Sequence, residues 1–319
     1  MRKLLIAILA VVSLASCSKE QIIVADRGDA IGFDTFIENA TRAAADDFTS
    51  VSSFQVWGDV TGNIVDSNDD YIFLYNGANV TRDGAAWTCR QTEYWIPFAT
   101  YNFLAIAGAT RVDSTTTGAF PTTINYTADG ATDLLLSDKV TVKTDGKSIP
   151  TGVNDNGCVP FTFKHLLSKV YFNFTNTSTS GNSTYTISDI KIAGAKMEGT
   201  YSIAEGWTFV SDDAVATPFS FGSVANTITK GASATSANAC LFIPGEQSLT
   251  VSFTQTYKYN GSAVNKPETV TATLTPAPTF AANGCYVINV ELKGGVAISF
   301  TVEQDGLNGW DNKTDISIP

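Results

Sequence analysis

Apolar and polar side chains alternate along most of this chain with a period of two, which is typical of β-strands that bury one face. Short polar gaps separate the alternating stretches, and the pattern contains no convincing amphipathic helix. Many short strands with polar gaps between them predict an all-β fold. The clearest alternating sets are Val170, Phe172 and Phe174; Leu249, Val251 and Phe253; and Tyr286, Ile288, Val290 and Leu292.

Asp-Gly and Asn-Gly pairs mark the turns that we expect between these strands, because both pairs favour tight hairpin connections. Asp83-Gly84 and Asn260-Gly261 each stand between two apolar stretches. Asn76-Gly77 directly follows the apolar run at residues 71–75. We therefore predict that a strand ends at Asn76-Gly77.

A stretch rich in Gly, Pro, Asn and Asp at residues 145–157 indicates a boundary between two domains. We expect a first β-sandwich at residues 43–157 and a second at residues 158–295, because each contains enough alternating strands for a sandwich. Residues 296–319 form a separate C-terminal region, which begins with another alternating strand.

The first 17 residues predict a lipoprotein signal peptide. Arg2 and Lys3 precede an unbroken apolar run at residues 4–12, which is too short to span a bilayer. The tetrad Leu-Ala-Ser-Cys then ends at Cys17 and matches a bacterial lipobox. We expect cleavage before Cys17 and lipidation of its thiol, which would hold the precursor to a membrane. An ordinary secretory signal with an incidental cysteine is the alternative.

Residues 18–42 form a leader that contains one strand-like stretch of its own. Small, polar and charged residues surround Arg42 at its end, so the Arg42–Ala43 bond is a candidate site for a trypsin-like protease. Arg27 is a second candidate for this cleavage. The predicted buried face of the leader strand consists of Ile31, Phe33, Thr35 and Ile37.

The leader strand and the C-terminal region share a sequence frame. Residues 30–35 and 297–302 both read Ala-Ile-x-Phe-x followed by a β-branched residue. This last residue is Thr35 in the first stretch and Val302 in the second. Two strands that occupy one groove in turn must present matching side chains at the same register. A chance match between two β-strands is the alternative. The side chains assigned to a C-terminal donor strand are Ile298, Phe300, Val302, Trp310, Ile316 and Ile318.

Charge and composition exclude several function classes. The chain is acidic, with a formal net charge of −11, so it lacks the basic surface that nucleic acid requires. It has a single His, His165, and its cysteines form no CxxC pair, so we expect no metal site and no cofactor. No nucleophile elbow or complete phosphate-binding loop is present, which favours a protein that is not an enzyme. The pairing state of four cysteines is left open: Cys89, Cys158, Cys240 and Cys285.

Several stretches together resemble the fimbrillin family of Bacteroidales, the subunits of type V pili. The resemblance implies two transthyretin-like β-sandwich domains in tandem and export as an outer-membrane lipoprotein precursor. It also implies cleavage by an extracellular Arg-specific protease and polymerisation by strand exchange at the cell surface. The stretches that carry it are the lipobox, the leader strand ending at Arg42, and residues 163–174, 241–253, 284–292 and 298–310.

The sequence thus predicts a structural subunit of a cell-surface fimbria, whose partners are other pilus subunits in a homo- or hetero-polymer. The leader would act as a placeholder strand until its removal, and the membrane would be contacted only through the lipid of the precursor. One alternative is a pilus tip or accessory adhesin that binds a host glycan or protein. Another is a surface lipoprotein that keeps its leader and never polymerises.

Overall fold

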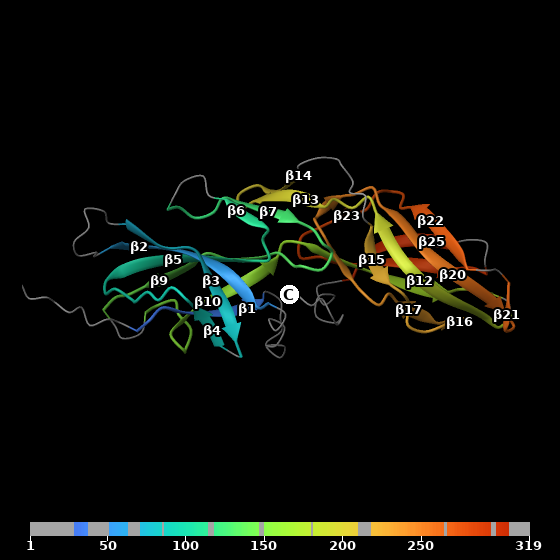
Figure 1. Cartoon of the computed structure of the whole chain (residues 1–319), viewed down its shortest axis with the longest axis horizontal. Helices are drawn as coiled ribbons and strands as arrows, with labels where there is room; N and C mark the ends of the chain where they lie inside the picture. Colours follow the sequence, from blue (N-terminus) through green and yellow to red (C-terminus); the bar gives the residue numbers. More distant parts are fainter. Residues whose placement is uncertain are drawn as a thin grey trace, which may run out of the picture.

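The computed structural model describes residues 29–37, 51–62, 71–84, 86–113, 118–146, 150–179, 181–209, 218–264, 267–294 and 298–305. Every regular element in these ranges is a β-strand, as the alternating pattern predicts. No helix among the described residues is long and apolar enough to cross a membrane. The molecule is elongated, with one large sheet at one end and a two-sheet sandwich at the other (Figure 1).

The first sheet has eight strands, and its core contains Phe54, Tyr101, Phe103 and Phe161. Its members in spatial order are β1 (Gly32–Ile37), β10 (Cys158–His165), β8 (Leu135–Ser137), β5 (Ala99–Ala107), β2 (Ser53–Gly62), β3 (Tyr71–Asp83) and β4 (Ala86–Cys89), with β9 (Val140–Lys143) also paired to β5.

The far end of the molecule is a sandwich of two sheets. One contains β17 (Ser233–Thr235), β11 (Ser168–Asn176), β24 (Cys285–Leu292) and β25 (Ile298–Gln304), with β18 (Cys240–Phe242) paired to β11. The other contains β15 (Phe219–Gly222), β12 (Ser183–Ala193), β20 (Thr250–Tyr259) and β21 (Ser262–Ala263), with β16 (Ile228–Thr229) paired to β12 and β22 (Glu268–Thr273) to β20.

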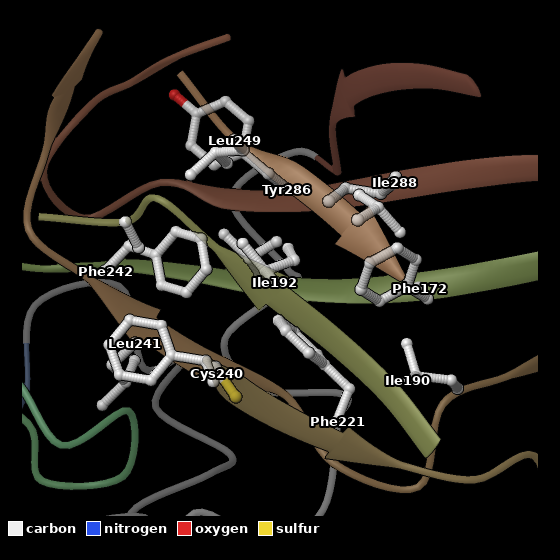
Figure 2. Packing of buried hydrophobic residues seen from close by; sticks show 14 of the residues in the cluster. Phe172, Ile190, Ile192, Phe221, Cys240, Leu241, Phe242, Leu249, Tyr286 and Ile288 are labelled. Carbon is white, nitrogen blue, oxygen red and sulfur yellow. The ribbon is translucent and has the colours of Figure 1, made fainter. Parts of the chain in front are cut away.

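Apolar side chains from both sheets of the sandwich meet in one core (Figure 2). Phe172 of β11 packs edge to face against Phe221 of β15, with ring centroids 4.8 Å apart. Ile192 of β12 and Ile288 of β24 are fully buried in the same cluster. Phe172 and Ile288 belong to the alternating sets of the sequence, so the period-two pattern identified the inner faces of β11 and β24 correctly.

Two smaller sheets complete the fold. A four-stranded sheet in the order β14 (Gly206–Phe209), β13 (Glu198–Ser202), β7 (Thr123–Thr127), β6 (Arg111–Asp113) joins segments from both halves of the sequence. A two-stranded sheet pairs β19 (Gly245–Glu246) with β23 (Thr279–Phe280). The pairing of β7 with β13 interlocks the two halves, whereas we expected each half to fold around its own sheets.

Residues 158–176 connect the first sheet directly to the sandwich. We expected residue 158 to open the second domain, but β10 lies in the first sheet between β1 and β8. Only Leu166 and Leu167 separate β10 from β11, and both leucines are buried. At this junction the ring of His165 hydrogen-bonds to the carboxylate of Asp133, and the indole N–H of Trp207 donates to the carbonyl of Leu166 at 2.9 Å.

The Asp-Gly and Asn-Gly signals have two different outcomes. Gly84 has a φ of +60° and lies in the turn between β3 and β4, and Asn260-Gly261 turns between β20 and β21, as predicted. The predicted strand end at Asn76-Gly77 is wrong, because β3 continues through it to Asp83. Gly77, with a φ of +72°, lies where the β2–β3 register shifts, so this pair forms a β-bulge.

Candidate functional site

The leader strand β1 occupies a slot between β10 of the first sheet and the segment that follows β4. It runs parallel to β10, with Gly32 opposite Cys158 and Ile37 opposite Phe163. On its other side the N–H of Ile31 donates to the carbonyl of Glu93 at 2.8 Å. β1 therefore lies between β10 and the segment that follows β4. The labels β1, β4 and β10 lie close together in Figure 1.

Two side chains of β1 and that of Ile31, directly before it, are buried in the first sheet. Ile31, Phe33 and Thr35 are 5%, 4% and 9% exposed, so the alternation read from the sequence gives the buried face correctly. The ring of Phe33 stacks on Phe161 of β10 at 5.8 Å and meets Tyr75 edge to face at 5.5 Å. Burying Ile31 and Phe33 contributes roughly 1.5–3 kcal/mol each.

Gly32 allows β1 to approach β10 closely. A Cβ at this position would lie 2.8 Å from the Sγ atom of Cys158, a distance that real Cβ atoms essentially never show. The neighbouring Asp34 accepts a hydrogen bond from the side-chain amide of Asn154 at 2.8 Å. Asn154 in turn accepts the backbone N–H of Cys158 at 3.0 Å. The loop before β10 thus holds the polar edge of β1 in place.

The wall opposite β10 is aromatic and internally hydrogen-bonded. Trp95 meets Tyr101 edge to face with centroids 4.9 Å apart. The Tyr101 hydroxyl accepts the N–H of Ile96 at 2.6 Å, and burial raises the pKa of Tyr101 to about 12. This phenol stays neutral at physiological pH and fixes the segment that contacts Ile31.

None of the four described cysteines forms a disulfide in the structure. Cys158 is half-buried beside β1, and its pKa is raised by burial and by the nearby Asp34 carboxylate. Burial alone raises the pKa of Cys240 to about 12 in the sandwich core. Neither thiol is a ready nucleophile, since the thiolate is the reactive form. Within the described residues no cluster of ligating side chains can hold a metal ion.

The candidate donor strand β25 lies in the sandwich sheet of its own chain. It pairs antiparallel with β24, with Ile298 opposite Leu292 and Val302 opposite Ile288. Ile298, Phe300 and Val302 pack partly buried against the sandwich core. The two strands that share a sequence frame therefore lie in different sheets: β1 in the first sheet and β25 in the sandwich.

A clasp at the end of β25 fixes it to the sheet. The hydroxyl of Tyr171 in β11 donates to the carboxylate of Asp305, and the N–H of Asp305 donates to the carbonyl of Cys285 at 2.8 Å. Burial and the Asp305 contact raise the pKa of Tyr171, so the hydroxyl keeps the proton that it donates.

Several predicted site residues lie outside the described residues: Cys17, Arg42, Ala43, Trp310, Ile316 and Ile318. Of Ile37 the structure describes the backbone, which pairs with Phe163. The sequence interpretation did not identify the walls of the slot around β1. The signal for one wall was present in Val159, Phe161 and Phe163, which alternate like the leader strand and are fully buried.

Comparisons with known proteins identify the family of this chain. The model of the fimbrillin-like family matches residues 41–304, most of the chain. The fold is shared with a fimbrial protein from Bacteroides vulgatus, which is 14% identical with a TM-score of 0.59, covering 87% of this chain and 99% of that one. A candidate cell adhesion protein from Bacteroides ovatus is 14% identical with a TM-score of 0.54, covering 87% and 98%.

No curated protein sequence matches the chain significantly. The two structural similarities are too low in identity to show more than a common fold, but the family match extends over strands of every sheet. This chain belongs to the fimbrillin-like family.

Proposed function

We propose that this protein is a structural subunit of a cell-surface fimbria of the type V pilus class, built from two transthyretin-like domains in tandem. It is exported as a precursor lipidated at Cys17 and cleaved between Arg42 and Ala43 by an extracellular Arg-specific protease. β1 then leaves, and the C-terminal strand of a neighbouring subunit occupies the vacated slot.

The observation that carries this proposal is the position of β1. It buries Ile31, Phe33 and Thr35 in the first core, yet it joins the body of the protein only through residues 38–50. Arg42 lies within that connection. Cleavage there would leave β1 held by hydrogen bonds and side-chain packing alone, so that a competing strand could replace it.

The slot has the properties of a strand acceptor. Loss of β1 would expose apolar side chains and unpaired backbone groups of β10, and an added strand satisfies both, as in donor-strand complementation. β10 also contains Pro160, and Pro in sheets occurs chiefly on edge strands. When β1 is absent, the part of β10 before Phe163 would have no strand partner, because the pairing with β8 covers only Phe163 to His165.

The donor strand has two requirements of its own. β25 must leave β24 before it can enter another subunit. This step breaks the backbone hydrogen bonds between the two strands and removes Phe300 from its packing against the sandwich core. Alignment of the two frames also places Ser299 where Gly32 lies. The Cβ of a serine there would meet the Sγ of Cys158, so the Cys158 side chain must rotate to accept the donor.

The test uses the unlipidated precursor, residues 18–319, treated with an Arg-specific protease. We expect a new N-terminus at Ala43 and a ladder of oligomers on gels run without boiling. Arg42→Ala should abolish both, whereas the matched variant Arg27→Ala should leave both unchanged. A form that ends at residue 295 should be cleaved but should not extend a ladder. Monomers that persist after cleavage at Ala43 would overturn strand exchange.

A further inference from the structure

A cavity of about 550 Å³ opens beside the first sheet, and no residue of β1 lines it. Residues of β2 and β3 form one wall, and the segment from β5 to the start of β6 forms the other. Nothing in the proposed strand exchange uses this cavity. Its volume lies in the range of small-molecule sites in proteins.

One wall of the cavity contains a donor group that no described residue accepts. Trp57 is only 5% exposed and lines the cavity, and its indole N–H makes no hydrogen bond to any described residue. The indole nitrogen is not among the buried unpaired atoms, so solvent reaches it. Water or a polar group of a bound molecule can accept this hydrogen bond.

Three amide side chains surround the indole. Gln55 of β2 and Asn79 of β3 are register partners, and Asn76 is the register partner of Trp57. The backbone of the bulge passes close to the indole, since a Cβ at Gly77 would lie 3.3 Å from the Trp57 ring. None of the three amides bonds through its side chain to a described residue. Each offers two donors and an acceptor, which matches the hydroxyl groups of a sugar.

The charge of the cavity points to a neutral ligand. Its lining contains no Asp, Glu, His, Lys or Cys. The one charged side chain, Arg111, is paired with Asp113 at 2.8 Å. The chain as a whole has a charge of −11, which disfavours anions. Hydrolysis of a glycosidic bond needs two carboxyl groups, so this lining is suited to binding and not to cleavage.

We propose that this cavity binds a short neutral saccharide through Gln55, Asn76, Asn79 and the indole N–H of Trp57. The site is independent of strand exchange, because no residue of β1 or β25 lines it. Saccharide binding and polymerisation can therefore fail separately. A peptide backbone also offers donors and acceptors, and β6 at the edge of its sheet lines part of the cavity, but the three amide side chains on β2 and β3 favour the polyol.

The test measures saturation-transfer NMR and titration calorimetry on the protein with residues 18–319, with β1 in place, against lactose, cellobiose and maltotriose. At least one should bind with a dissociation constant of about 10 mM or tighter. Asn76→Ala and Gln55→Ala should each weaken binding about fivefold, the effect of one lost hydrogen bond. Asn156→Ala changes an exposed asparagine that does not line the cavity and should have no effect.

Trp57→Phe provides a second measurement. It should remove the saccharide-dependent change in tryptophan fluorescence while the thermal unfolding of the protein shows that the fold is kept. If this variant does not fold, the Asn76 and Gln55 variants still test the proposal. Both side chains are exposed, so we expect their truncation to leave the fold intact. Absence of binding by all three saccharides, or equal binding by the Asn76 and Gln55 variants, would overturn the proposal. Binding of peptides alone would overturn it as well.

Discussion

Gly32 in β1 lies directly against Cys158 in β10, so closely that a Cβ at residue 32 would stand 2.8 Å from the sulfur atom. The two residues are register partners in the parallel ladder that holds the leader strand. This contact makes the fit of β1 sensitive to a single methyl group, and it places a thiol where it can report on the slot.

Gly32→Ala should weaken the docking of the leader strand. The added methyl group overlaps Sγ of Cys158, and overpacking of this kind costs about 1–3 kcal/mol. Guanidinium unfolding of the precursor should show a lower free energy of unfolding. Cys158→Ala removes the sulfur, so the double variant should recover most of the loss, and additive effects would contradict the contact.

Phe33→Ala should destabilise the precursor by about 3–5 kcal/mol, because it leaves a cavity among Phe161, Tyr75 and Phe103. Calorimetric unfolding of the precursor measures the effect. The control is Val264→Ala, which truncates a side chain that is 61% exposed and should change stability by about 0.5 kcal/mol or less. Similar losses in both variants would show that Phe33 does not anchor β1.

Cys158 should react faster with iodoacetamide once β1 has been removed. Burial and Asp34 both raise the pKa of this thiol in the precursor, and Asp34 leaves with β1. The pKa then falls towards the ordinary value, so more thiolate is present at about pH 8 and access improves as well. Mass spectrometry of each labelled site follows the rate across pH.

Cys240 is the internal control for this labelling. It is buried in the sandwich with a pKa of about 12, so its slow reaction should not change with cleavage. Addition of the donor strand from a neighbouring subunit should slow the labelling of Cys158 again. Equal rates before and after cleavage would mean that β1 stays in its slot.

Tyr171→Phe should loosen β25 without disturbing the sandwich core. The variant removes the hydroxyl that donates to Asp305 and should lower the free energy of local opening by about 1–2 kcal/mol. Hydrogen exchange should accelerate at residues 298–305, whereas the amides of β12 serve as the unchanged reference. Since β25 must leave its own sheet to be donated, the cleaved variant should also polymerise faster. An unchanged polymerisation rate would place the exchanged strand beyond Asp305.

The alternating pattern determined which faces are buried, because burial on one face of a strand follows from local spacing. It identified Phe33 in β1 and Val251 in β20 as core residues. The pattern could not assign partners. β1 pairs in parallel with β10 across more than a third of the chain, and β7 pairs with β13, and neither pairing leaves a local signal.

Turn chemistry was similarly ambiguous at one position. An Asn-Gly pair supplies a residue with positive φ, which suits a hairpin turn at Asn260-Gly261 and a bulge at Asn76-Gly77. The difference depends on whether the next stretch folds back or continues along the same neighbour, here β2. The bulge lies against Trp57 and lines the proposed saccharide cavity. Because the sequence did not distinguish the bulge from a turn, it could not predict this cavity.

The continuity of β10 and β11 has a mechanical consequence for a fibre of the proposed kind. A donor strand in the slot would pull on β10, and the pull would pass through Leu166 and Leu167 along the covalent backbone into β11. From there the shortest route to β25 crosses one ladder, the parallel pairing of β11 with β24. Tension along the fibre would therefore act on the β11–β24 ladder in every subunit. The strength of this ladder would set the force at which a subunit opens.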